Sequence, residues 1–125
     1  MSTRALKAGA VGVVIDGRFR DINEHRELGM GSFARGTSIF GSHTFTRSSE
    51  LNVPVSYRIE ELERKFRVAP GDLIMGDADG VVAIPPEMAE DVARLCESRW
   101  NIDEATRKCV EDDEDIGPVI QILRE

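Results

Sequence analysis

The sequence predicts a mixed α/β fold, and three features of the chain support this prediction. A run of β-branched residues over 11–16 indicates a buried strand. Three short apolar runs over 66–84 are separated by Pro-Gly and Asp-Gly turns, a pattern typical of antiparallel strands. Apolar residues spaced as on one helical face over 86–110 indicate a helix. We therefore expect one domain over 1–125, with a helical tail over about 86–125.

Composition excludes several classes of protein. The formal net charge of -7 argues against a nucleic-acid surface, which needs a basic patch. Cys96 and Cys109 lack the paired spacing of a zinc site. No apolar run is long enough to span a membrane, and the first ten residues lack the apolar core of a signal peptide. We therefore expect a cytoplasmic protein that binds neither membrane nor nucleic acid directly.

The first part of the chain should alternate helix and strand. Ser2 or Thr3 can cap a short helix that ends at Gly9, and the strand over 11–16 should stop at the turn pair Asp16-Gly17. A helix from Asp21 to Leu28 should follow. The remaining elements expected are a strand over 32–34, a loop over 36–49, an edge strand over 53–59, a three-stranded meander with strands at 66–68, 73–75 and 81–84, and a final short helix over 119–123.

The pair Arg20-Asp21 is the strongest candidate for polar chemistry, because it follows a predicted buried strand. A guanidinium offers a planar fork to a substrate carboxylate, and an aspartate oxygen can hold a hard divalent cation. The same residues also fit a helix N-cap beside a surface arginine. On these grounds Arg18 could equally be the arginine that binds a ligand.

Three neighbouring candidates each have a structural alternative. Glu24 either shares a metal shell with Asp21 or completes a capping box at the start of the helix. His25 is either a general acid or base or a solvent-facing helical residue. His43 lies in a Ser/Thr-rich loop with no carboxylate close in sequence.

Other motifs favour structure over chemistry. Asp72, Asp77 and Asp79 are close enough to suggest calcium, but they do not match the twelve-residue EF-hand loop, and turn chemistry accounts for them. The chain contains neither a G-x-S-x-G elbow nor a phosphate-binding glycine loop.

Three blocks occur in a distinctive order: G-A-V-G-V-V-I-D-G-R-F-R-D over 9–21, F-A-R-G over 33–36, and P-G-D-L-I-M-G-D-A-D-G-V-V-A-I-P over 70–85. Together they resemble the RraA-like family, which includes the regulators of ribonuclease activity A and the metal-dependent 4-hydroxy-4-methyl-2-oxoglutarate aldolases. The resemblance covers about Ala5 to Pro86 and implies a layered β-β-α fold of the swivelling type. It also implies a homotrimer or a dimer of trimers, with a site near a subunit interface.

In the aldolases of this family, the Asp of the R-D pair holds a divalent ion, and the Arg binds the keto-acid and stabilises its enolate. The resemblance therefore assigns the metal to Asp21, with Glu24 acting through a water, and the substrate to Arg20. The ion is expected to be Mg²⁺, with Mn²⁺ as the alternative. The implied activity is cleavage of 4-hydroxy-4-methyl-2-oxoglutarate-type keto-acids to pyruvate, with oxaloacetate decarboxylation as a side activity.

Two departures from the family pattern matter. In the family, a glycine-rich segment upstream of the R-D pair completes the site, and its position here would precede Met1, so we expect a domain that is incomplete at its N-terminus. The R-D-x-x-E pattern formed with Glu24 resembles the regulator subgroup. The alternative function is therefore a non-catalytic regulator that binds and masks an RNA-degrading endonuclease.

Overall fold

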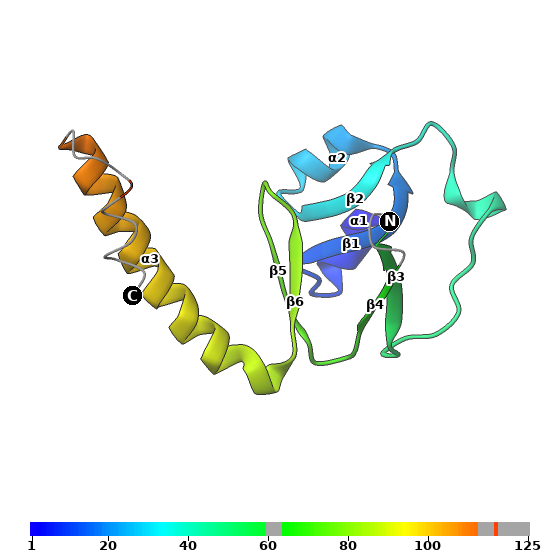
Figure 1. Cartoon of the computed structure of the whole chain (residues 1–125). Helices are drawn as coiled ribbons and strands as arrows, with labels where there is room; N and C mark the ends of the chain where they lie inside the picture. The colour runs from blue at the N-terminus through cyan, green and yellow to red at the C-terminus, as the bar shows by residue number, and fades with distance from the viewer. Residues whose placement is uncertain (60–63, 113–116, 118–125) are drawn as a thin grey trace. The chain divides into compact units, whose positions relative to one another are not determined.

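The mixed α/β fold is confirmed by the computed structural model, which describes residues 1–59, 64–112 and 117 (Figure 1). The helix expected over 119–123 lies outside these residues. The chain divides into two compact units, Met1–Ala83 and Ile84–Glu125. In the described part of the chain, no helix is both long and apolar enough to cross a membrane.

The first unit begins with one short helix and continues with a β-α-β arrangement. Helix α1 covers Ser2–Lys7, strand β1 covers Gly12–Phe19, helix α2 covers Ile22–Glu27 and strand β2 covers Gly31–Thr37. The two strands are parallel, with Gly12 opposite Gly31 and Phe19 opposite Thr37. A parallel pair needs a crossover connection, and α2 supplies it. As a result, the carboxyl ends of β1 and β2 lie at the same edge.

The prediction of a turn at Asp16-Gly17 is wrong, because β1 continues through these residues. The strand register shifts between Ile15 and Arg18: Ile15 lies opposite Ala34, whereas Arg18 lies opposite Gly36. Two residues of β1 therefore oppose one residue of β2, which is the count of a β-bulge. Residues that favour turns can be absorbed at such a bulge, and here the bulge lengthens the strand instead of ending it.

The prediction that this strand is buried is also wrong for the described residues. Val13, Val14 and Ile15 are half-buried, and Val11, just before the strand, is 92% exposed. The physical reason is that β1 pairs only with β2 in the described part of the chain, so its sheet is narrow. Met30, between α2 and β2, is the one large apolar residue there that is buried.

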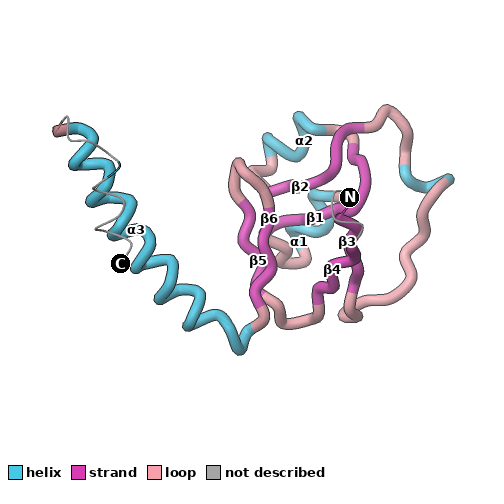
Figure 2. The backbone as a smooth tube through the Cα atoms, in the orientation of Figure 1, coloured by secondary structure: helices cyan, strands magenta, loops and turns pink. Residues whose placement is uncertain are grey.

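The remaining strands form two hairpins. Strand β3 covers Val55–Ile59 and pairs antiparallel with β4, Arg64–Val68, while β5, Leu73–Gly76, pairs with β6, Val81–Ile84. The meander prediction therefore located the last three strands but paired them wrongly, since β4 joins β3 and not β5 among the described residues. The loop between β2 and β3 carries only the short 3-10 helix η1, Ser42–Thr44 (Figure 2).

Both hairpins contact the β1–β2 sheet. The Tyr57 hydroxyl of β3 donates to the Val14 carbonyl of β1 at 3.3 Å. Gly76 of β5 lies against the Phe33 ring of β2, and a Cβ placed on Gly76 would be 2.5 Å from that ring. Glycine is therefore required where the β5 backbone meets the aromatic side chain.

In the second unit, 3-10 helix η3, Pro86–Met88, leads into helix α3, Ala89–Glu111. The predicted helix over 86–110 is thus confirmed. Proline at its start fits the first turn, where a missing N–H costs nothing. Arg94 and Arg107 each form ion pairs with acidic residues three or four positions away, which supports an exposed helical surface.

Candidate active site

A shallow cavity of about 570 Å³ opens at the carboxyl end of β1. Its lining comes from the end of β1, from α2 and from the end of β2: Arg20, Asp21, Ile22, Asn23, Glu24, Arg26, Thr37 and Ser38. The two strand ends are held together there, since the Ser38 N–H donates to the Phe19 carbonyl at 2.8 Å. The carboxyl edge of parallel strands is where open α/β sheets usually bind ligands.

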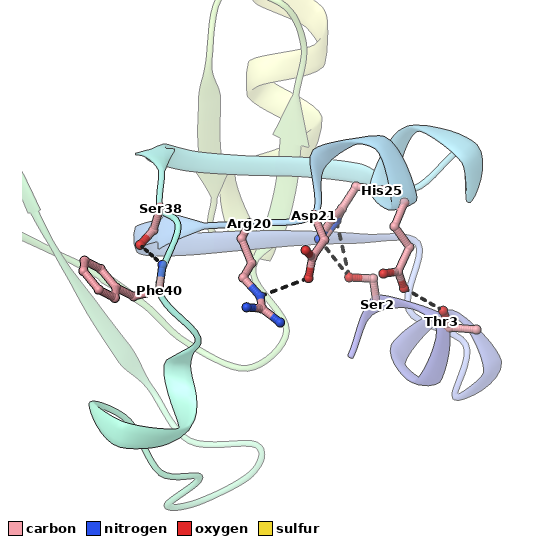
Figure 3. Close-up of polar contacts among 8 residues, drawn as sticks. Ser2, Thr3, Arg20, Asp21, His25, Ser38 and Phe40 are labelled. Atoms are coloured by element: carbon pink, nitrogen blue, oxygen red, sulfur yellow. Dashed lines mark hydrogen bonds and ion pairs between the residues drawn. The ribbon is translucent and has the colours of Figure 1, made fainter.

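Arg20 and Asp21 form an ion pair within this lining. Arg20 Nε donates to Asp21 Oδ2 at 3.1 Å, and the two side chains are 54% and 53% exposed (Figure 3). Such an exposed pair adds little to stability. The ion pair instead orients the Arg20 guanidinium, because the bond uses Nε and leaves Nη1 and Nη2 turned away from Asp21. Among the described residues, neither Nη atom has a hydrogen-bond partner.

Asp21 has a backbone conformation that aspartate seldom adopts. Its φ of 63° and ψ of 42° are left-handed, although it occupies the N-cap position of α2. The left-handed region costs a non-glycine residue about 1–2 kcal/mol, and Asp and Asn tolerate it best. Strain of this kind gathers at functional sites.

The predicted N-cap position of Asp21 is confirmed, but the capping interactions are not present. The Asp21 side chain makes no capping hydrogen bond and instead accepts from Arg20. Glu24 does not complete a capping box, because its Oε1 accepts from the Thr3 hydroxyl at 3.1 Å. Glu24 thus helps join α2 to α1, and the Asp21 carboxylate is not needed as a helix cap.

The structure separates the two candidate arginines. Arg18 Nη1 donates to the Thr37 carbonyl at 3.1 Å, so Arg18 bridges β1 to the end of β2. Arg18 does not line the cavity, whereas Arg20 does. Of the two candidate arginines, Arg20 is the one in the cavity lining.

His25 is neither solvent-facing nor in the cavity lining. Its Nε2 lies 3.0 Å from Ser2 Oγ and its Nδ1 lies 2.8 Å from Ser32 Oγ. Its ring packs edge-on against Phe19, with centroids 4.9 Å apart. Ser2 is itself buried, so His25 links α1, α2 and β2 as a packed polar residue. The prediction of a solvent-facing helical histidine is wrong because α1 covers this side of α2.

His43 approaches the site through the loop after β2. It lies in η1, and both its Nδ1 and Arg20 Nη1 come close to Gly41, at 3.5 and 3.8 Å from where a Gly41 Cβ would be. His43 itself is exposed, and its Nε2 is 3.4 Å from the Thr44 hydroxyl. The side chains of His43 and Arg20 therefore both approach Gly41, and no hydrogen bond between the two is present among the described residues.

The aspartates of the hairpin region take turn roles. Asp72 Oδ2 accepts from the Ala69 N–H at 2.8 Å. Asp77 Oδ1 accepts from the N–H groups of Asp79 and Gly80, at 2.9 and 3.2 Å. Turn chemistry therefore explains Asp72 and Asp77, as the sequence predicted.

The oxygen atoms near Asp21 suit a metal ion that is held by one protein carboxylate and several waters. The described residues contain no group of three or more His, Cys, Asp or Glu arranged to hold a metal. The half-exposed Asp21 carboxylate has one oxygen on Arg20, and its other oxygen has no protein partner within the described ranges. A single carboxylate fits Mg²⁺, which keeps several waters and takes one or two protein carboxylates.

Sequence reasoning missed five residues of the lining: Ile22, Asn23, Arg26, Thr37 and Ser38. One signal was available, because Asn23 and Arg26 are three residues apart on one helix and so share a face. Thr37 and Ser38 could not be found without knowing that β1 and β2 are parallel neighbours, since only that pairing brings the residues after β2 beside Arg20.

The comparisons with known proteins agree with this arrangement. The model of the family described as "RraA-like: Aldolase/RraA" matches residues 1–83. The chain belongs to the RraA-like family. This match covers the whole β-α-β arrangement and both hairpins as far as Ala83, including every residue of the cavity lining.

Two relatives share over a third of the aligned residues. A protein of Halalkalibacterium halodurans named "Putative 4-hydroxy-4-methyl-2-oxoglutarate aldolase" is 38% identical over 104 residues, which is 83% of this chain and 46% of that protein. "Uncharacterized protein MJ0644" of Methanocaldococcus jannaschii is 34% identical over 107 residues, or 86% of this chain and 47% of that protein. The chain therefore spans about half the length of the curated relatives it matches.

A solved structure shares the fold. An uncharacterized protein from Pseudomonas syringae pv. tomato superposes with a TM-score of 0.80 over 95% of this chain and 56% of that protein, at 24% sequence identity. At this identity the likeness concerns the fold alone.

Proposed function

We propose that this chain cleaves 4-hydroxy-4-methyl-2-oxoglutarate-type keto-acids to pyruvate in a divalent-metal-dependent aldolase reaction, with oxaloacetate decarboxylation as a side activity. One observation carries the proposal: Arg20 and Asp21 line one cavity, where the Nη atoms of Arg20 have no hydrogen-bond partner among the described residues and Asp21 has a left-handed conformation. The family and the name of the relative from H. halodurans support the same reaction class.

Arg20 binds and stabilises the reacting end of the substrate. Its two Nη groups form a planar fork that matches a carboxylate, while the Nε bond to Asp21 keeps the fork oriented. In the retro-aldol reaction the 4-hydroxyl loses its proton to water, the bond between C3 and C4 breaks, and C4 becomes the keto carbon of one pyruvate. The electron pair of the broken bond forms the enolate of a second pyruvate, with negative charge on its keto oxygen, and C3 then takes up a proton from water. A fixed cation beside that oxygen lowers the barrier, because it stabilises the charge without reorganising.

Asp21 would hold the divalent ion through its carboxylate, with waters completing the ion's shell. When bound, the ion supplies a Lewis acid that polarises the keto group. The left-handed backbone holds Asp21 next to Arg20 at the start of α2, and the ion pair with Arg20 directs its carboxylate along the cavity lining.

The test is pyruvate release from oxaloacetate and from 4-hydroxy-4-methyl-2-oxoglutarate, with Mg²⁺ and then with EDTA. We expect EDTA to abolish turnover and Asp21→Asn to lower kcat/KM by at least about 100-fold. Arg20→Lys should lower it by about 100- to 1,000-fold, the usual loss when one stabilising donor is removed. An ammonium cannot reproduce the planar fork.

The matched control is Arg67→Lys, an equivalent change on β4 outside the cavity, which should leave kcat/KM unchanged. Pyruvate release that persists in EDTA, or that survives Asp21→Asn, would contradict the metal role. A folded chain that releases no pyruvate under either condition would overturn the aldolase proposal in favour of the non-catalytic regulator.

A further inference from the structure

Arg26 lines the same cavity as Arg20 and has no role in the reaction proposed above. Arg20 stands just before the first turn of α2, and Arg26 lies in its last turn. The helix rises about 1.5 Å per residue, so it separates the two positions by a short, fixed length along the cavity. Two cations thus face one cavity from opposite ends of a short helix.

The side-chain contacts of Arg26 differ from those of Arg18, Arg94 and Arg107. Arg18 donates to the Thr37 carbonyl, and Arg94 and Arg107 form ion pairs along α3. Within the described residues, no hydrogen bond or ion pair involves the side chain of Arg26. A cation in the last turn favours the helix dipole wherever its side chain points. That effect does not account for a position in the cavity lining.

Among the described residues, no carboxylate of the cavity forms an ion pair with Arg26. Asp21 is paired with Arg20, and Glu24 Oε1 accepts from the Thr3 hydroxyl on α1. Asn23 and Ser38 add neutral polar groups to the lining. Ser38 Oγ already accepts from the Phe40 N–H at 3.1 Å, so its hydroxyl hydrogen remains available to a ligand.

We infer that Arg26 binds the distal carboxylate of the substrate and so makes the site selective for dicarboxylic over monocarboxylic keto-acids. This inference rests on the proposed function, since Arg20 is taken to bind the keto-acid end. A guanidinium fork recognises a carboxylate through two parallel N–H groups. Two such forks on one cavity therefore select a short acid with a carboxylate at each end.

The test uses binding rather than turnover. 2-Oxoglutarate and 2-oxopentanoate have the same chain length and keto group but differ in the distal carboxylate, and neither carries the 4-hydroxyl that cleavage requires. Dissociation constants for both are measured by calorimetry with Mg²⁺ present, for the full chain, Arg26→Gln, Arg26→Lys and the control Arg67→Gln on β4. Thermal melting of each variant confirms that it is folded.

We expect the unmodified chain and Arg67→Gln to bind 2-oxoglutarate at least about tenfold more tightly than 2-oxopentanoate, the size of effect expected for a charged hydrogen-bonded pair. Arg26→Gln should weaken 2-oxoglutarate binding until the preference disappears, with 2-oxopentanoate unchanged. Arg26→Lys should retain part of the preference, because it keeps the charge and loses the fork.

Equal affinity of the unmodified chain for both acids would overturn the inference, as would no binding of either acid or a preference that survives Arg26→Gln. Failure of the proposed function looks different: the preference and its loss in Arg26→Gln would be present, while pyruvate release from cleavable substrates would be absent.

Discussion

At the scale of single residues, the backbone of Asp21 is the most informative feature. Asp21 takes the N-cap position without using its side chain as a cap, and it sits in the left-handed region. A structural cap would keep extended backbone angles and bond the N–H groups of the first turn. The observed geometry therefore lowers local stability, and the Asp21 carboxylate faces Arg20 and the cavity instead of capping the helix.

This conclusion predicts how substitutions at Asp21 separate stability from activity. Asp21→Ala places a residue intolerant of this conformation there and should lower the free energy of unfolding by about 1 kcal/mol. Asp21→Gly should be close to neutral in stability, because glycine adopts the left-handed region freely. Both variants should lose pyruvate release. Urea denaturation and the turnover assay measure the two effects.

The control is Glu27→Ala in the last turn of α2, where the backbone is helical and alanine is favourable. If Asp21→Ala and Asp21→Gly were equally stable, the left-handed conformation would not be the cost that we assign to it.

At the scale of elements, Asp16 holds three strands of the first unit together. Its carboxylate accepts from the Arg35 side chain of β2 and, at 3.3 Å, from the Arg58 N–H of β3. Arg35 also donates to the Arg58 carbonyl. Asp16 lies at the bulge of β1, so the bulge that lengthens the strand also aims this carboxylate at its neighbours.

The hydrogen bond from Arg35 lowers the pKa of the Asp16 carboxyl, with smaller lowering from Arg58 and opposition from desolvation. A carboxyl whose folded pKa is depressed stabilises the fold above its ordinary pKa of about 3.9 and loses that effect as pH falls through the folded value. Asp16→Asn should therefore lower Tm at pH 7. The difference from the unmodified chain should shrink below about pH 3.9 and vanish in stronger acid.

Thermal melts across this pH range check the expectation. Asp79→Asn in the β5–β6 turn is the control, because no described hydrogen bond involves the Asp79 side chain, and its Tm should follow that of the unmodified chain. If the Tm of Asp16→Asn stayed below that of the unmodified chain by the same amount into strong acid, the ion-pair explanation would be contradicted.

At the scale of the whole molecule, the described residues form little apolar core. Met30 is the one large apolar residue buried among those the structure describes. The loop between β2 and β3 exposes Ile39, Phe40, Phe45 and Leu51 by 67–92%, and the two phenylalanine rings pack edge-on with centroids 6.2 Å apart. Exposed apolar side chains gathered on one loop favour association with another surface.

We therefore expect the chain to self-associate, with a homotrimer or a dimer of trimers as the assembly that the family resemblance implies. Light scattering coupled to size-exclusion chromatography should give a mass several times 13.9 kDa. Replacing Phe40 and Phe45 together by serine should shift the chain toward the monomer, because it removes the largest exposed apolar groups of the loop.

The surface variant Lys65→Ser on β4 serves as the control and should leave the mass unchanged. A monomeric mass for the unmodified chain at high concentration would contradict self-association. An assembly that persists in the double serine variant would place the interface elsewhere.

Much of this protein was determined by the sequence itself. The strands after the loop, the long helix from Pro86 and the Arg20-Asp21 pair were all predicted from local patterns. These features depend on side-chain periodicity, turn residues and order along the chain, which act within a few residues. The family membership followed from motif order for the same reason.

Only the tertiary structure decided which polar residues meet. Parallel pairing of β1 with β2 brought Ser38 and Arg20 to one cavity and bound Arg18 to the Thr37 carbonyl, which separated two arginines that local residue patterns alone had left as alternatives. Contact with α1 engaged one oxygen of Glu24 and made His25 a packed polar residue outside the cavity lining. These outcomes depend on distances between segments far apart in sequence, and local patterns carry no information about such distances.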